Sequence, residues 1–505
     1  MPLRMWMLDV AREQCLDAER LIAYAKLTAE AGYDALGLYL EHRYAYPSTP
    51  WSHGVDCLRP EDVQKVRREF PDLRLVPFVN LLGHFEGMLY TEQGKRYREA
   101  RFQGMQACPS NPDFVRLCEG LVDDTLAAFD DELVHIGGDE TQQLGQCPEC
   151  RQRVDSEKGD GKAALYGEHF GPLARRVERA GRRPAVWGDM FAEHPGALEA
   201  MPKSTVIFDW QYFSGCAETS VPFADKGFDV VGCPTLQTYN ATWMNLSASE
   251  ENVRQVVEDV RTHALHGVCV TTWECGLFGA YDTLFPAIRA CGDLLNGKDT
   301  PFLTAYLRES ETYEEWARLM GVELPEVGGS FAAGRIRSSL KVRFLLNANP
   351  FLAWLYHGDE FAGEIGEAAL DVFERALAVA PNEACRGVTR FARGAVEFVR
   401  LAEEARTRYA EGKPEAAIGK LAATRTIFDD LQRVARATHA RIGGSRADIE
   451  RCRVAREHVE RVIQRIRHHG DGSLGYLPAF EHITHPKFVP HDQAAWWLIN
   501  RFANE

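Results

Sequence analysis

Two adjacent carboxylates at the end of an apolar segment are the clearest candidates for chemistry in this chain. The segment reads His135-Ile136-Gly137-Gly138-Asp139-Glu140, and Leu133-Val134 before it has the character of a buried strand. The two glycines free the backbone to bend and let a ligand approach closely. Because neighbouring carboxylates repel each other, one of them is expected to hold its proton near neutral pH. A general acid requires that property.

The segments that would position this pair alternate between strand-like and helix-like patterns. Helical patterns such as 16–31 and 113–129 separate eight short apolar runs. The runs are 4–10, 34–40, 74–80, 132–137, 183–187, 205–210, 228–233 and 267–273. This alternation predicts an α/β fold, a (β/α)8 TIM barrel over residues 1–298. The alternative is an open doubly wound sheet, which requires a glycine-rich phosphate loop after the first strand, and Asp9-Val10-Ala11-Arg12 is not one.

The composition changes near residue 300, and residues 299–505 are predicted to form an α-helical C-terminal domain. Its helical segments are 330–357, 363–380, 383–411, 413–440 and 445–468, and the breaks between them contain glycine or proline. The end, 471–505, contains Trp496-Trp497 and is expected to pack back on a domain or on a partner subunit. A homodimer is therefore an open alternative to a monomer.

Length and charge restrict the class of protein. The 505 residues suffice for two or three domains, and the formal net charge of −15 argues against nucleic acid and anionic membranes as partners. No apolar run approaches the roughly 18 residues that a membrane span needs. The N-terminus, Met1-Pro2-Leu3-Arg4, lacks the regions of a signal peptide, so a cytoplasmic location is expected.

The 13 cysteines are an odd number and most stand singly in apolar segments, which is typical of reduced thiols. Cys147-Pro148-Glu149-Cys150 is the exception. It is interpreted as structural thiols, with half of a zinc site and a local disulfide as alternatives, and Cys57 or Cys118 could approach it. Because no second CxxC or HxxxH follows, the sequence predicts no metal and no cofactor.

The segment from His135 to Glu140 resembles the signature of glycoside hydrolase family 20, the β-N-acetylhexosaminidases. The first strand, with Leu8-Asp9 and Arg12, is similar to the RxxxLDxxR opening of that family. Leu82-Gly83-His84 resembles its PGH segment, and Cys108-Pro109-Ser110-Asn111-Pro112 its stretch one helix before the signature. The resemblance covers about residues 1–295 and looks like a short, cytosolic-type branch without the preceding β domain.

The resemblance implies a retaining exo-β-N-acetylhexosaminidase that removes terminal β-linked GlcNAc or GalNAc from a glycan or glycoconjugate. Family 20 enzymes use the 2-acetamido group of the substrate as the nucleophile, through an oxazolinium intermediate. Glu140 would protonate the leaving oxygen and later activate water. Asp139 would orient the acetamide and stabilise the positive charge that develops.

The resemblance also implies a sugar-binding pocket built from residues at successive strand ends. Arg12 would donate to sugar hydroxyls, His84 would support the carboxylates, and Tyr239 would donate to the acetamide oxygen. Tryptophan walls and further polar contacts complete the expected set, which comprises Trp187, Asp189, Trp210, Trp273 and Glu274.

The chain departs from the family pattern at three places. Asn80-Leu81-Leu82 stands where the family commonly has Asp before PGH, Tyr39-Leu40-Glu41-His42-Arg43 replaces HxxDDxxW, and Trp273-Glu274 contracts WxE. These positions concern the outer hydroxyls of the sugar, so the choice between gluco and galacto substrates stays open.

Other functions share parts of this residue set. A metal-dependent TIM-barrel hydrolase would use His84, His135, Asp139 and Asp189 as ligands. A non-catalytic sugar-binding protein would bind without turnover, and a transglycosylating relative would use the same site with a sugar acceptor in place of water.

Overall fold

A computed structural model describes most of the chain. The described residues are 3–11, 17–54, 57–100, 103–237, 243–273, 280–325, 345–346, 349–351, 353–354, 358, 361–442 and 446–473. The chain divides into two compact units. Unit 1 comprises residues 1–236, 249–272 and 287–301, and unit 2 comprises 237–248, 273–286 and 302–505. The domain boundary after residue 298 stays a prediction.

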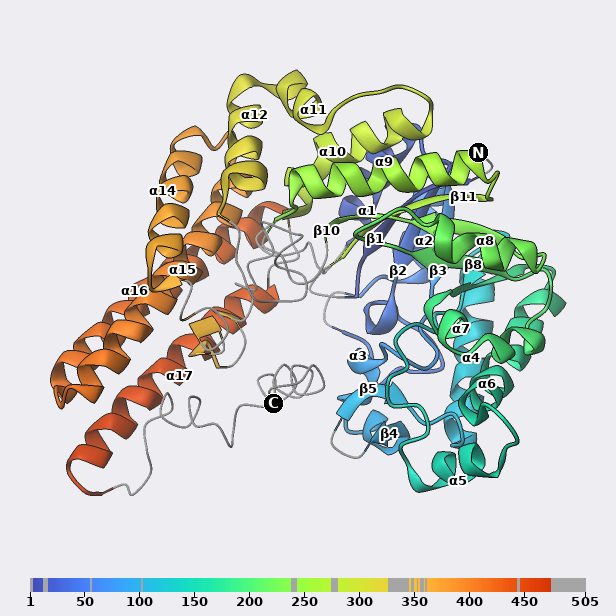
Figure 1. The fold of residues 1–505 in the computed structure, drawn as a ribbon, viewed down its shortest axis with the longest axis horizontal. Coiled ribbons are helices and arrows are strands. Elements are labelled where there is room, and N and C mark those ends of the chain that lie inside the picture. Colours follow the sequence, from blue (N-terminus) through green and yellow to red (C-terminus); the bar gives the residue numbers. More distant parts are fainter. Residues whose placement is uncertain are drawn as a thin grey trace. The chain divides into compact units, whose positions relative to one another are not determined.

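Unit 1 contains the predicted (β/α)8 TIM barrel (Figure 1). Within the described residues, the barrel strands are β1 (Leu3–Asp9), β2 (Ala35–Tyr39), β3 (Arg74–Phe78), β6 (Leu133–His135), β7 (Arg183–Trp187), β8 (Val206–Trp210), β9 (Asp229–Cys233) and β11 (Gly267–Thr272). All of them pair in parallel, and β1 closes the barrel by pairing with both β2 and β11. A short strand, β10 (Thr235–Gln237), extends the sheet beside β11. The eight barrel strands coincide with the eight predicted runs to within about two residues at most ends, since buried parallel strands are nearly continuous apolar segments.

Helices surround the barrel, and most follow a barrel strand in sequence. They are α1 (Ala18–Glu30), α2 (Pro60–Glu69), α4 (Pro112–Ala128), α6 (Gly161–Arg179), α7 (Asp189–Glu193), α8 (Ala217–Asp225), α9 (Leu246–Thr262) and α10 (Ala280–Leu295). Local sequence sets their starts: Asp17 accepts the backbone N–H of Arg20 ahead of α1, and Asn111 accepts two N–H groups ahead of α4. The helices predicted at 16–31 and 113–129 are therefore confirmed as α1 and α4.

Two connections at the carboxyl ends of the strands carry additional structure. The one between β3 and α4 contains α3 (Glu86–Leu89) and a hairpin of β4 (Arg98–Ala100) and β5 (Gln103–Ala107). The one between β6 and α6 contains α5 (Pro148–Ser156). Short 3-10 turns occupy Glu41–Arg43, Gly94–Tyr97 and Pro195–Ala200.

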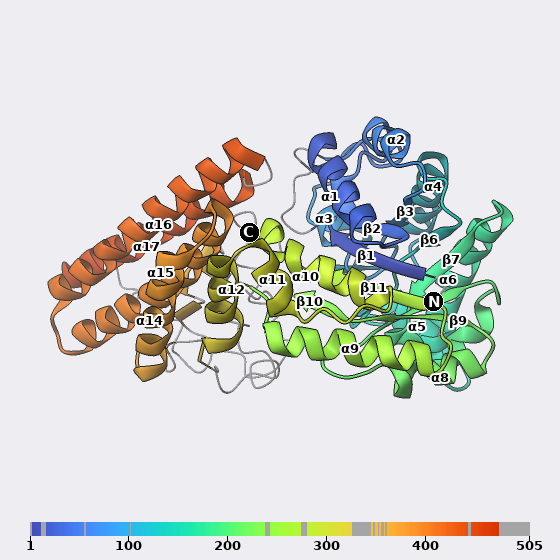
Figure 2. The ribbon, with the colours of Figure 1, turned by 90° about the horizontal axis from the view of Figure 1, so that it is seen from above.

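Unit 2 is predominantly helical, as the sequence predicts for the C-terminal region (Figure 2). Its later helices are α11 (Phe302–Glu309), α12 (Glu311–Arg318), a π-helical turn (Leu319–Glu323), α14 (Glu364–Val379), α15 (Glu383–Ala410), α16 (Pro414–Ile442) and α17 (Arg446–Gly470). Consecutive helices from α14 to α17 pack against each other. Two of the predicted breaks are present: Asn382 caps α15, and Gly412 adopts a φ of 74° before Pro414 opens α16. The break predicted at Gly358 is wrong, since Gly358 is helical.

Several predicted features of unit 2 lie outside the described residues. They include most of the helix predicted at 330–357, the break at Gly443-Gly444, and the tail with Trp496-Trp497. Across the helices that are described, none combines the length and the hydrophobicity that crossing a membrane demands.

Candidate active site

The sequence-predicted residues of unit 1 lie where barrel strands end. His84 follows β3, Asp139 and Glu140 follow β6, Asp189 follows β7, and Trp210 is the last residue of β8. These four strands are consecutive neighbours in the barrel. Because they are parallel, their carboxyl ends meet at one rim, which brings the five side chains to the same face.

His84 joins the two carboxylates of the Asp139-Glu140 pair. Its Nε2 lies 2.8 Å from Glu140 Oε2 and 3.5 Å from Asp139 Oδ2, and its Nδ1 lies 3.5 Å from Glu86 Oε1. Burial opposes a positive charge on His84, but the charge of Asp139 and the hydrogen bond to Glu140 outweigh it and raise its pKa well above the usual value. His84 is therefore an imidazolium at neutral pH, and it offsets the repulsion between its carboxylate neighbours.

The two carboxylates differ in solvent exposure. The Glu140 side chain is 34% exposed, whereas that of Asp139 is 10% exposed. A ligand arriving from solvent therefore reaches Glu140 first, which suits proton exchange with a substrate. Asp139 lies deeper, where an electrostatic interaction is screened less by water.

The backbone around this cluster adopts left-handed conformations. φ is 76° at Gly137, 107° at Gly138, 45° at Glu140 and 47° at His84. A Cβ at Gly138 would lie 2.3 Å from the hydroxyl oxygen of Tyr166, which donates a hydrogen bond of 2.6 Å to the Gly138 carbonyl. The glycine is therefore required both for its φ and for this close approach. Strain at the non-glycine positions is typical of residues that a surrounding structure holds for function.

Asp189 connects the rim of β7 to the Asp139-Glu140 pair. Its Oδ2 accepts the backbone N–H of Glu140 at 2.8 Å, and its Oδ1 accepts the indole N–H of Trp210 at 3.3 Å. Burial and the negative charge of Asp139 raise the pKa of Asp189 to about 8. The protonated form of Asp189 is therefore favoured at neutral pH.

Aromatic rings fill the barrel interior below the rim. Trp187 has no exposed surface and packs 4.5 Å from the ring of His135, measured between centroids. His135 also stacks on Phe78 at 4.4 Å, and burial lowers its pKa well below the usual value. His135 and Trp187 thus contribute to the core at this level, and a sugar-binding role for Trp187 stays a prediction.

The remaining predicted residues fall into two groups. Trp273 follows β11 directly and is buried. Arg12, Tyr239 and Glu274 lie outside the described residues, so their predicted roles stay predictions.

Three supporting residues were missed at the sequence level. Tyr166 lies on α6 and bonds to Gly138, while Asn80 donates from its amide to the His84 carbonyl at 2.9 Å. Gln106 accepts the backbone N–H of Gln143 at 2.9 Å and so joins β5 to the connection after β6. Asn80 had a sequence signal, since it stands beside the PGH-like segment, but Tyr166 and Gln106 had none.

The described residues contain one group of side chains with the types and spacing to hold a metal ion, and it is separate from the cluster of His84 and the carboxylates. It consists of Glu99, Cys108, Cys147 and Cys150. Cys108, which the sequence did not single out as a partner, approaches the CxxC, whereas the Cys118 thiol donates to the Leu81 carbonyl at 3.4 Å. None of the described cysteines forms a disulfide.

Fold and site together define a class of protein, a parallel (β/α)8 barrel with a histidine and paired carboxylates at the carboxyl ends of its strands. Residues 83–274 match the model of the glycosyl hydrolase family 20 catalytic domain. Over these residues the chain carries the glycoside hydrolase family 20 catalytic domain. The predicted resemblance is thereby confirmed.

Individual relatives are distant. A β-hexosaminidase of Vibrio furnissii is 22% identical over 178 residues, which cover 33% of this chain and 28% of that protein. The structure of Flavobacterium johnsoniae chitobiase is 15% identical with a TM-score of 0.50 and covers 94% of this chain and 73% of its own. The structure of a Vibrio harveyi exo-β-N-acetylglucosaminidase is 17% identical with a TM-score of 0.48, and the match covers 60% of this chain and 56% of that one. The chain thus spans little more than a quarter of the V. furnissii relative, and at 15% identity the chitobiase likeness shows the shared fold alone.

Proposed function

We propose that this protein is a retaining exo-β-N-acetylhexosaminidase that removes terminal β-linked GlcNAc or GalNAc by substrate-assisted catalysis. The observation that supports it most directly is the convergence of Glu140 and Asp139 on His84 at the carboxyl rim of the barrel. The match of residues 83–274 to the family 20 catalytic domain supports the same assignment. The substrate would be a glycan or glycoconjugate with a terminal N-acetylhexosamine.

In this proposal Glu140 is the general acid and then the general base. Its side chain is the more exposed of the pair, and its backbone is fixed by the hydrogen bond to Asp189. Glu140 delivers its proton to the leaving oxygen as the glycosidic bond breaks, and it recovers a proton from water in the second step. His84 holds the carboxyl group in place through the 2.8 Å contact with Oε2.

Asp139 acts on the acetamide group of the substrate. It accepts the acetamide N–H, which turns the carbonyl oxygen towards the anomeric carbon, and that oxygen forms the new bond. The oxazolinium that results is positively charged, and the buried carboxylate stabilises it in a site where water screens little. Asp139 and Glu140 are adjacent in sequence, so they are poorly placed to act on opposite faces of the sugar as the two carboxyl groups of other retaining glycosidases do. The acetamide oxygen therefore supplies the nucleophile in this proposal.

A comparison of three nitrophenyl glycosides tests the proposal on the full chain. We expect turnover of the β-GlcNAc or β-GalNAc substrate and none of the plain β-glucoside, because the glucoside has no acetamide to act as nucleophile. Turnover of the glucoside alone would overturn the mechanism. Product analysis with a sugar acceptor distinguishes hydrolysis from transfer.

The metal-dependent alternative receives less support. Of its four ligands, His135 lies stacked between rings in the barrel interior, and its Nδ1 accepts the backbone N–H of Gly137 at 3.1 Å. His84 Nε2 is already engaged by Glu140. We therefore expect the initial rate of turnover, measured in the first minutes, to be the same with and without a chelator.

A further inference from the structure

The buried group formed by Glu99, Cys108, Cys147 and Cys150 lies outside the proposed catalytic machinery. One potential ligand atom from each of the four side chains lies within 4.8 Å of all the others. Glu99, Cys108 and Cys150 are buried, and Cys147 is partly exposed. From these residues we propose that the chain holds one structural Zn²⁺ ion, bound by the three thiolates and the Glu99 carboxylate.

The distances fit a common centre better than a disulfide. Cys108 Sγ lies 3.6 Å from Cys147 Sγ and 3.5 Å from Cys150 Sγ, and Cys150 Sγ lies 3.3 Å from Glu99 Oε2. Two sulfurs bound to tetrahedral zinc at about 2.3 Å lie roughly 3.8 Å apart, and a sulfur–oxygen pair somewhat less. A disulfide would bring one sulfur pair to about 2.05 Å, whereas Cys108 is equally far from both partners.

The charges also call for a cation. Glu99 is a buried carboxylate that faces a thiol, and none of the four side chains is basic. Basic side chains lie in the wall of the adjoining pocket, but a cation bound within the group would offset the negative charge of the carboxylate directly. Three thiolates with one carboxylate form a set that suits Zn²⁺, since thiolates favour soft or borderline ions and zinc also accepts a carboxylate oxygen.

Hydrogen bonds orient the ligands as they do around structural metal ions. Cys147 Sγ accepts the backbone N–H of Cys150 at 3.3 Å, and Glu99 Oε1 accepts that of Cys147 at 2.9 Å. Ser110 Oγ lies 3.0 Å from Cys150 Sγ and accepts a bond of 2.8 Å from Arg153. Groups of this kind fix ligand direction and moderate the negative charge of the thiolates.

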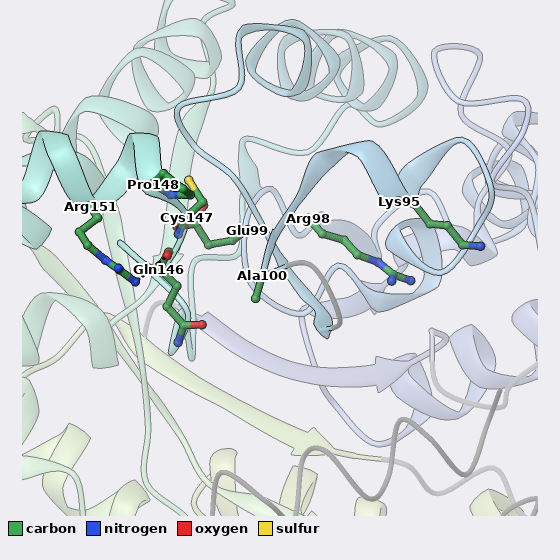
Figure 3. A pocket seen from close by; sticks show the side chains of 8 residues that line it. All are labelled: Lys95, Arg98, Glu99, Ala100, Gln146, Cys147, Pro148 and Arg151. Atoms are coloured by element: carbon green, nitrogen blue, oxygen red, sulfur yellow. Dashed lines mark hydrogen bonds between the residues drawn. The ribbon is translucent and has the colours of Figure 1, made fainter.

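A surface pocket of about 620 Å³ gives an ion a route to the ligands. Figure 3 shows Glu99 and Cys147 in its wall, together with the basic side chains of Lys95, Arg98 and Arg151. Cys147 is the thiol that this pocket brings to solvent. It is therefore the thiol expected to react with an alkylating reagent when the ion is removed.

The ion would join the two connections that bear the catalytic residues. Glu99 and Cys108 belong to the connection after β3, which carries His84, and Cys147 and Cys150 belong to the connection after β6, which carries Glu140. The β5 strand before Cys108 is bonded to the segment around His84, through Ala107 N–H to Leu82 O at 3.0 Å and Phe85 N–H to Met105 O at 3.0 Å. The zinc thus has a positioning role, and its presence does not depend on the proposed glycosidase activity.

Metal analysis of the full chain, purified under reducing conditions without chelator, tests the proposal. We expect about one zinc per chain, and cobalt substituted for it should give the thiolate charge-transfer absorption and visible bands of a tetrahedral site. Cys147→Ser should lose the zinc, Glu99→Gln should bind it at least about tenfold more weakly, and Cys57→Ser, a control outside the group, should retain it.

Alkylation with iodoacetamide gives a second measurement that does not require a folded variant. In the wild-type protein, zinc should protect Cys147, and a strong chelator should expose it. The proposal is overturned if the reduced protein neither contains nor takes up zinc. It is also overturned if Cys147 reacts equally in the presence and absence of zinc, since these residues would then be plain thiols. A disulfide among the three cysteines, or stoichiometric binding of a different metal, would overturn it as well.

Discussion

Two clusters of acidic side chains lie on the same two connections of the barrel, and they balance their charge differently. His84, Asp139 and Glu140 form one, with a cation among its own members. Glu99, Cys108, Cys147 and Cys150 form the other, and all of its members are acidic. In the first cluster a protein side chain offsets the negative charge, whereas in the second the proposed Zn²⁺ ion does so.

Their backbones differ in the same sense. His84, Gly138 and Glu140 adopt positive φ. The four residues of the second cluster, all of which the structure describes, have negative φ. A strained backbone marks the place where side chains are held against their preference, as reactive groups often are. The relaxed backbone of the thiol cluster suits a site that contributes stability.

Replacing Glu140 by Gln should have the largest effect, since in the proposed mechanism Glu140 supplies the proton to the leaving oxygen. We expect turnover of natural oligosaccharides to fall about 10²–10⁴-fold, the usual contribution of acid–base catalysis. Gln keeps an oxygen that can accept from His84, so the cluster should keep its shape. Substrates with very good leaving groups need no proton in the first step, so the variant should carry out that step on them at a rate closer to that of the wild type. Near-wild-type rates on oligosaccharides would remove Glu140 from the acid role.

Asp139→Asn should follow, with a loss of about 10²–10³ in kcat, comparable to the loss of one electrostatic stabiliser. An amide still bonds to the acetamide but cannot offset the charge of the oxazolinium. A thiazoline analogue of that intermediate should bind the wild-type protein far more tightly than substrate, and this preference should disappear in the variant. Equal affinity of both proteins for the thiazoline would argue against substrate assistance.

A pH experiment tests the protonation of Asp189, which accepts the backbone N–H of Glu140 in the first cluster. The pKa of Asp189 is about 8 in the folded protein, against an ordinary value of 3.8. Between these values the folded state holds a proton that the unfolded chain has released, so this group makes stability fall as pH rises, by up to about 1.4 kcal/mol per pH unit. Below about pH 5.5, His84 is largely protonated in both states and adds little slope.

The measurement is the unfolding free energy of wild type and Asp189→Asn, from denaturant titrations at several pH values between about 4 and 6. The asparagine has no such proton, so the difference between the two curves should change in favour of the variant as pH rises. Parallel curves would show that Asp189 titrates like an ordinary carboxylate.

How far the sequence alone predicts this molecule depends on how local each signal is. The barrel strands were predictable because each is a short apolar run, and α15 and α16 because Asn382 and Pro414 mark their starts. His84, Asp139 and Glu140 were grouped correctly because they stand directly after strands that lie near one another.

The partners that come from distant positions were not predictable. Cys108 lies 39 residues before Cys147, and only the folded β4–β5 hairpin brings it to the CxxC. Tyr166 lies on α6, whose buried face contains many similar apolar residues, so no sequence pattern distinguishes the one that bonds to Gly138.

The smallest predicted difference, between two variants, concerns backbone strain and uses two glycines as a matched pair. Gly138 and Gly159 have φ values of 107° and 103°, but only Gly138 has a neighbour in the way of a Cβ, since nothing lies within 4 Å of that position at Gly159. Gly159→Ala should therefore cost the strain alone, about 1–3 kcal/mol, and Gly138→Ala about 1–2 kcal/mol more from the clash with Tyr166. Thermal or denaturant unfolding of both variants measures the difference. Because Gly138 directly precedes Asp139, Gly138→Ala should also lower kcat, whereas Gly159→Ala should leave it unchanged. Equal losses of stability would show that the Tyr166 contact adjusts freely, and that the backbone beneath the carboxylate pair is less constrained than that contact indicates.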